Sequence, residues 1–273
     1  MLNVSKADVA VEPYPHVVSN QMLDPDLYER LKKDFPKLAD HQGGDSTGSR
    51  VGKGKGFDIY RGDQAYDELV RRSPAWAEFD AWINSPAFVH KFNELFGPYL
   101  EQLGINAQID PSAYDRDLVE GRSELKEKLT RIERLKAKLA KAIPSASSDR
   151  PVLFTRLDVE KSTSGYDKPP HCDRGNRLCS LIIYFCDADE RGLEGGELQI
   201  FRHKRERAIE KMPRHPAPED VTEVARLKPR DNLGVFFPCS NNSYHGVTQI
   251  KSQGVERDFL YINISADEMS LWK

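Results

Sequence analysis

Short runs of β-branched and aromatic residues fill the chain from residue 151 onward. Clusters of Gly, Asp, Asn or Pro separate these runs, which are VLFTRLDV, LCSLIIYFC, GELQIFRH, TEVARL, LGVFF, YHGVTQI and FLYINIS. Both the residue types in the runs and the clusters between them are typical of β-strands that end in turns. Seven or eight strands within about 120 residues predict a sandwich, a barrel or a jelly roll.

The first 110 residues predict helices instead. Apolar residues recur there at helical spacing, each time after a capping residue followed by proline, at Asp24-Pro25, Ser73-Pro74 and Ser85-Pro86. The apolar faces of these helices need a partner, and we expect them to pack on one sheet of the downstream strands. The Gly-, Ser- and Lys-rich segment 41–58 lacks periodicity and predicts a surface loop, with a lid or substrate-contacting loop as the alternative.

A strongly basic helix is predicted over residues 122–143. The segment carries eight Lys or Arg against three Glu, and its apolar stripe consists of Leu125, Leu129, Ile132, Leu135 and Leu139. Such a stripe needs burial, because isolated helices gain most of their stability from tertiary packing. We expect the helix to dock on the same molecule or on a second copy, which would make a homodimer, with its basic back facing water.

Composition narrows the class of protein. The formal net charge of −3 gives no reason to expect nucleic acid or a membrane as a partner. The four cysteines form no C-x-x-C pair, and no signal peptide or membrane-spanning run is present in the sequence, so a reduced, cytoplasmic protein is expected. We predict one domain over residues 1–273, with helical support (1–110), an inserted helical segment and linker (111–150) and a strand-rich core (151–273).

Three residues suggest a metal site. His171 and Asp173 are two positions apart, so on an extended chain both side chains point to the same face, while Cys172 between them points away. His245 can supply a third ligand from a later strand. Two imidazoles and one carboxylate on one face of a metal leave positions open, which is the pattern of non-haem iron(II) oxygenases. The remaining histidines have no such context and are expected at the surface or in caps: His16, His41, His90, His203 and His215.

Arg257 is the predicted fourth element of the site. It opens the strand RDFLYINIS, whose alternation turns Arg257, Phe259, Tyr261 and Asn263 to one face and Leu260, Ile262 and Ile264 to the other. The first set suits a pocket wall, and the second suits a face buried under helices. A guanidinium binds a carboxylate bidentately. Lys251, in the KSQG turn, is the competing candidate for this role.

These motifs resemble the 2-oxoglutarate and iron(II)-dependent dioxygenase superfamily, in its prolyl-hydroxylase-like branch. The resemblance covers residues 151–265 and rests on PHCD, SLIIYFCD, GGELQIF, LGVFFPCSNNSYHGV and GVERDFLYINI, and PYPHVVSNQMLDPDLYERLKKDFP is similar to the branch's opening segment. The basic helix and HKRERAIEKMPRHPAPED lie outside the common pattern. The family's arginine usually follows the distal histidine more closely than Arg257 follows His245, so Lys251 stays open as the alternative.

The resemblance implies an α+β protein with a double-stranded β-helix (jelly-roll) core, with N-terminal helices packed on one sheet and an inserted basic helix. It implies that His171, Asp173 and His245 bind Fe(II), that Arg257 binds the far carboxylate of 2-oxoglutarate, and that Tyr184 lies near that carboxylate. O2 is then the co-substrate, and ascorbate is a candidate reductant.

The expected reaction hydroxylates a C–H bond of a peptidyl prolyl, an amino acid or another small substrate, with release of succinate and CO2. The expected partner is therefore a small molecule or a peptide. The alternative is a non-catalytic, cupin-like domain that binds a metal or a small molecule.

Overall fold

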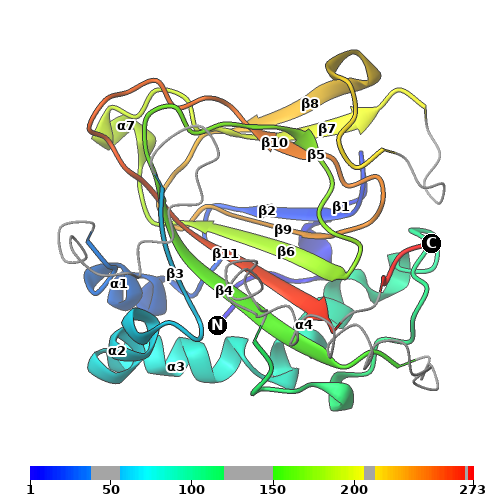
Figure 1. Ribbon diagram of the computed structural model, residues 1–273, viewed down its shortest axis with the longest axis horizontal. Helices are drawn as coiled ribbons and strands as arrows, with labels where there is room; N and C mark the ends of the chain where they lie inside the picture. The colour runs from blue at the N-terminus through cyan, green and yellow to red at the C-terminus, as the bar shows by residue number, and fades with distance from the viewer. Residues whose placement is uncertain (38–55, 120–149, 206–212, 268–269) are drawn as a thin grey trace, which may run out of the picture.

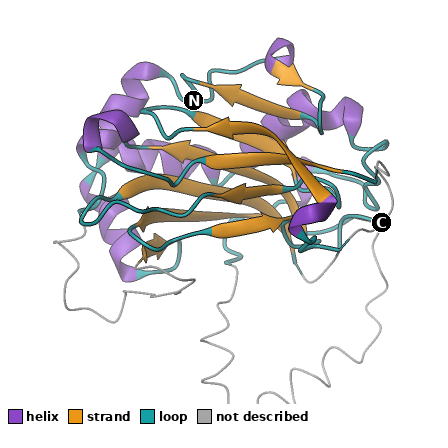
Figure 2. Ribbon diagram, turned by 90° about the horizontal axis from the view of Figure 1, so that it is seen from above, coloured by secondary structure: helices purple, strands orange, loops and turns teal. Residues whose placement is uncertain are grey.

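Two antiparallel sheets face each other, and helices cover the outer side of the larger one (Figure 1). The computed structural model describes residues 1–37, 56–119, 150–205, 213–267 and 270–273. The larger sheet has seven strands in the order β1-β2-β9-β6-β11-β4-β3, and the smaller has four in the order β5-β10-β7-β8. Figure 2 shows the same strands from above, in orange.

The strands of the larger sheet are β1 (Val9–Ala10), β2 (His16–Ser19), β3 (Gly56–Tyr60), β4 (Leu153–Ser162), β6 (Arg177–Tyr184), β9 (Gly234–Pro238) and β11 (Arg257–Ala266). Those of the smaller sheet are β5 (Lys168–His171), β7 (Leu198–His203), β8 (Val221–Leu227) and β10 (His245–Val247). From β4 onward the chain passes back and forth between the two sheets. Segments distant in sequence therefore meet in the space between them.

Four longer helices lie beneath the larger sheet: α1 (Pro25–Lys33), α2 (Gln64–Arg72), α3 (Pro74–Ile83) and α4 (Pro86–Phe96). The three predicted starts are confirmed, because Asp24, Ser73 and Ser85 each accept a hydrogen bond from a backbone N–H of the following first turn. The remaining helices are short: η1 (Lys6–Asp8), η3 (Gly97–Tyr99), η4 (Pro111–Ala113), α7 (Ala188–Arg191) and η5 (Pro218–Asp220).

The alternation predicted for the last strand is confirmed on β11. Leu260, Ile262 and Ile264 belong to the core shared with the helices. Phe259 and Tyr261 belong to a second apolar cluster between the sheets, together with residues of β7 and β10. Both faces of β11 are buried, which explains why its sequence contains almost no charged residue after its first two positions.

Several elements were not predicted. Helix α2 and strands β1, β2 and β3 were missed, and β3 takes in residues 56–58, the end of the segment expected to be a loop. Strands β1 and β2 are too short to show a periodicity. They form because β2 pairs with β9 and β1 pairs with β2, and no local sequence pattern indicates these contacts. The rest of the 41–58 segment and the whole of the 122–143 helix lie outside the described residues.

Among the residues that the structure describes, none of the helices combines the length and the apolar character needed to cross a lipid bilayer.

Candidate metal centre

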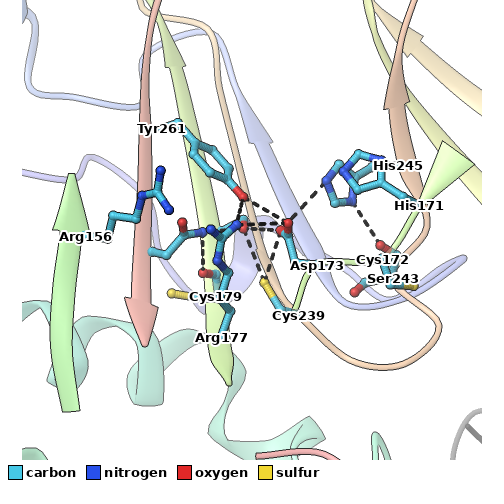
Figure 3. Close-up of polar contacts among 12 residues, drawn as sticks. Arg156, His171, Cys172, Asp173, Arg177, Cys179, Cys239, Ser243, His245 and Tyr261 are labelled. Atoms are coloured by element: carbon cyan, nitrogen blue, oxygen red, sulfur yellow. Dashed lines mark hydrogen bonds and ion pairs between the residues drawn. The ribbon is translucent and has the colours of Figure 1, made fainter. Parts of the chain in front are cut away.

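The three residues predicted as metal ligands come together between the sheets. His171 ends β5, His245 begins β10, and the two residues are direct cross-strand partners. Asp173 follows two residues after His171, and one potential ligand atom from each of the three lies within 4.8 Å of the others (Figure 3). All three side chains are buried. Cys172 points away, as predicted, into an apolar cluster with Phe201 and Tyr244.

Both imidazoles are oriented by the backbone. The Nδ1 atom of His171 lies 2.9 Å from the Pro169 carbonyl oxygen, and that of His245 lies 3.0 Å from the Ser243 carbonyl oxygen. A carbonyl oxygen can only accept, so each Nδ1 carries the proton and donates it. The Nε2 lone pairs are therefore free for a metal, and the hydrogen bonds to the two backbone carbonyls fix the ring orientation.

Burial lowers the pKa of His171 to about 3, helped by the nearby His245, and burial also lowers the pKa of His245. Both rings are consequently neutral near pH 7, which is the form that binds metals.

The Asp173 carboxylate is held in place by side chains of the larger sheet. Its Oδ1 accepts hydrogen bonds from Arg177 Nη1 (3.1 Å) and the Tyr261 hydroxyl (2.9 Å). Its Oδ2 accepts one from the Ser180 hydroxyl (2.5 Å) and lies 3.8 Å from His245 Nε2. Burial by itself would raise the pKa of this carboxyl, but Arg177 and the two histidines hold that pKa well below its usual range. An ionised carboxylate beside two neutral imidazoles is a donor set that fits Fe(II).

Ser180 offers a test of how the Asp173 carboxylate is held in place. Its hydroxyl donates to Asp173 and in turn accepts a hydrogen bond from Asn263 Nδ2 (2.6 Å). Replacing Ser180 with Ala should weaken iron binding by about tenfold, because partners that orient a ligand typically contribute that much. Iron affinity measured by competition with a chelator checks this. An affinity equal to that of the unchanged protein would mean that Arg177, Tyr261 and Cys239 position the carboxylate without Ser180.

Arg257 is buried, and no carboxylate of the described residues forms an ion pair with it. The side chain is 2% exposed, and its Nη1 donates to the Gly196 carbonyl oxygen (3.0 Å). Its Nε has no hydrogen-bond partner in the described part of the chain. The guanidinium lies over the Phe259 ring, 4.3 Å from the centroid, and faces Tyr184 at 5.7 Å. A buried guanidinium that lacks an anion is costly, so this position suits an anionic ligand.

Tyr184 and Lys251 lie in very different surroundings. The Tyr184 hydroxyl is buried and, like the Arg257 Nε, has no hydrogen-bond partner within the described ranges. Burial raises the pKa of Tyr184 to about 12, so the hydroxyl keeps its proton and can donate. Lys251 is exposed, with 65% of its side chain accessible, and it pairs with Glu194 at 3.3 Å. The structure thus places Arg257 and Tyr184, and not Lys251, beside the pocket.

One pocket is lined both by Arg257 and by His245, one of the three predicted ligands. It contains about 380 Å³ of empty space, open solvent at its mouth included, and its lining takes in His245, Tyr261, Tyr184 and Arg257. The same lining contains Tyr166, Lys168, Glu160, Ile182, Leu198, Val247 and Phe259. A cleft whose apolar walls carry convergent polar groups is the usual form of a small-ligand site.

Sequence reasoning missed several residues around the ligands. Arg177 and Ser180 surround Asp173, and only their positions shortly after it in the sequence could have suggested this. Histidines were also misplaced, because His16 and His203 are buried rather than at the surface. His215 is exposed as expected, yet its ring lies 6.1 Å from that of His171.

Comparisons with known proteins agree with this geometry. Residues 157–264 match the family model of the 2OG-Fe(II) oxygenase superfamily, and this range contains all three ligands, Tyr184 and Arg257. No curated protein sequence matches the chain significantly.

Solved structures with a similar fold include three prolyl hydroxylases. For a prolyl 4-hydroxylase from Phytophthora capsici the TM-score is 0.48 at 15% identity, over 93% of this chain and 60% of the other, so this chain spans less than two thirds of that protein. For one from Pseudomonas putida the TM-score is 0.47 at 13% identity, over 92% of both chains. For one from Trichoplax adhaerens, in complex with a hypoxia inducible factor peptide fragment, the TM-score is 0.46 at 10% identity, over 92% of this chain and 83% of the other.

The superfamily uses Fe(II), 2-oxoglutarate and O2, as predicted. Residues 157–264, about two fifths of the chain, thus resemble the 2OG-Fe(II) oxygenase superfamily.

Proposed function

We propose that the protein is an Fe(II)- and 2-oxoglutarate-dependent dioxygenase. It hydroxylates a C–H bond of a peptidyl prolyl, an amino acid or another small substrate and releases succinate and CO2. One observation carries the proposal: His171, Asp173 and His245 form one cluster, and the pocket that His245 lines also contains a buried guanidinium with no anionic partner among the described residues.

The strand order supports a double-stranded β-helix as the core of a single domain over residues 1–273. Strands β9, β6, β11 and β4 adjoin in one sheet, β5, β10, β7 and β8 adjoin in the other, and consecutive strands mostly change sheet. This arrangement places the ligands on the inner faces, where water is largely excluded. The homodimer through the 122–143 helix and a cytoplasmic location stay predictions.

The residues of the chain have distinct tasks in this reaction. His171 and His245 offer Nε2 to Fe(II), and Asp173 offers a carboxylate oxygen that Ser180, Arg177 and Tyr261 hold in position. Arg257 binds the distal carboxylate of 2-oxoglutarate, and the Tyr184 hydroxyl donates to the same group.

When bound, Fe(II) and 2-oxoglutarate would activate O2 for the oxidation of an unactivated C–H bond. The chain contributes orientation, neutral imidazoles and a largely buried pocket between the sheets.

Succinate release tests this function. The protein with Fe(II), ascorbate as reductant, 2-oxoglutarate and O2 should form succinate, and a panel of prolyl peptides and free amino acids should reveal which substrate accelerates it. A matched reaction under nitrogen is the control, because succinate formation must then stop. A cupin-like binding domain would bind iron and form no succinate under any of these conditions.

A further inference from the structure

A β-bulge brings an unpredicted lysine into the pocket. Strand β5 pairs with β10 through His171↔His245 and Lys168↔Val247, so three steps along β5 oppose two steps along β10. Side chains three positions apart on a regular strand point to opposite faces. The extra residue of the bulge cancels this offset, and Lys168 reaches the same inner face as His171. The intervening Pro169 and Pro170 have no N–H to donate, which suits an irregular edge strand.

The Lys168 ammonium lies at the metal end of the pocket. It is 5.6 Å from the centroid of the Tyr261 ring, and the Tyr261 hydroxyl donates to Asp173. Arg257 lies instead over Phe259, two residues earlier on β11. The two cations therefore lie over different rings of β11 within the same pocket.

The environment of Lys168 leaves its charge available to a ligand. Lys168 is an exposed residue of an edge strand, yet its side chain lines the pocket. Within the described ranges, its ammonium makes neither a hydrogen bond nor an ion pair. Tyr166, then Tyr261 and then Glu160 raise the pKa of Lys168, so the amine stays protonated. Glu160 is the carboxylate among the residues that line the pocket. A protonated amine without a fixed partner beside the ligand cluster is suited to an anion that binds there.

We propose that Lys168 binds the carboxylate adjacent to the keto group of 2-oxoglutarate, while Arg257 binds the distal carboxylate. The inference rests on the proposed function, because it assigns the two ends of the same co-substrate to two cations. Each cation recognises a different part of the molecule. Loss of Lys168 should weaken the binding of every 2-oxo acid. Loss of Arg257 should weaken only the binding of those 2-oxo acids that carry a second carboxylate.

The experiment compares two ligands on four variants. The Fe(II)-loaded protein, kept free of O2, is titrated calorimetrically with 2-oxoglutarate and with 2-oxobutanoate, which has no distal carboxylate. Lys168→Met should weaken both ligands by about tenfold or more, the usual contribution of one charged hydrogen bond. Arg257→Met should weaken 2-oxoglutarate alone. Lys168→Arg should restore most of the affinity, and Lys251→Met, at an exposed lysine, serves as the matched control.

Three results would overturn the assignment of Lys168. The first is an unchanged affinity of Lys168→Met for both ligands. The second is a loss of affinity in Lys168→Met for 2-oxoglutarate alone, and the third is an equal loss of affinity in Lys251→Met. Iron content measured on each variant separates a local effect from a damaged fold. The proposed function fails separately, if the unchanged protein neither binds 2-oxoglutarate nor forms succinate. If it does both and Lys168→Met matches it, only the lysine assignment is wrong.

Discussion

Replacing Asp173 with Ala is expected to abolish stoichiometric iron binding and, with it, turnover of 2-oxoglutarate. The carboxylate is the only anionic member of the ligand cluster, so its loss removes both a ligand atom and the charge that attracts a divalent ion. Elemental analysis of iron in the purified variant, beside succinate release, gives the measurement. Asp189→Ala is the matched control, because Asp189 is an exposed carboxylate that pairs with Lys228 on the surface.

Full iron occupancy in Asp173→Ala would remove this residue from the metal site. The variant also leaves the buried Arg177 without its carboxylate partner, so a loss of stability is expected in addition. Thermal unfolding of the iron-free forms separates that effect from metal binding.

Replacing Arg257 with Ala should greatly raise the 2-oxoglutarate concentration needed for turnover and leave iron in place. The distal carboxylate loses its charge-assisted partner in a closed pocket, which costs on the order of 2–4 kcal/mol. That corresponds to a KM increase of roughly 30-fold to 1,000-fold, since each 1.4 kcal/mol is a factor of ten. Steady-state kinetics with varied 2-oxoglutarate, together with iron content, provide the measurement.

Lys251→Ala is the matched control for the arginine. Because Lys251 is exposed and pairs with Glu194, its removal should change KM little. A large KM increase in Lys251→Ala, with a normal KM in Arg257→Ala, would reverse the assignment of the anchor.

The parts of this molecule that could be predicted are those that local patterns encode. His171 and Asp173 share a face because they are two residues apart, and the alternation of β11 alone turned Phe259 toward the pocket and Leu260 toward the helices. Helix starts were also local, since a cap and a proline suffice to identify them.

The rest depends on contacts between distant segments. Lys168 would be assigned to the wrong face by simple alternation, because the bulge exists only once β5 has paired with β10. Tyr261 holds Asp173 from β11, 88 residues further along the chain, and His203 is buried through its position on β7. No periodicity within one strand specifies any of these neighbours.

The three predicted ligands are divided unequally between the two sheets. His171 and His245 belong to adjacent strands of the smaller sheet, whereas the Asp173 carboxylate is held by Ser180 and Tyr261 of the larger one. An ion bound by all three would act as a cross-link between the sheets. Its binding free energy would then add to the cohesion of the folded chain by mass action. The same three side chains would then serve both the reaction and the stability of the fold. Removing the metal would loosen the packing of one sheet against the other.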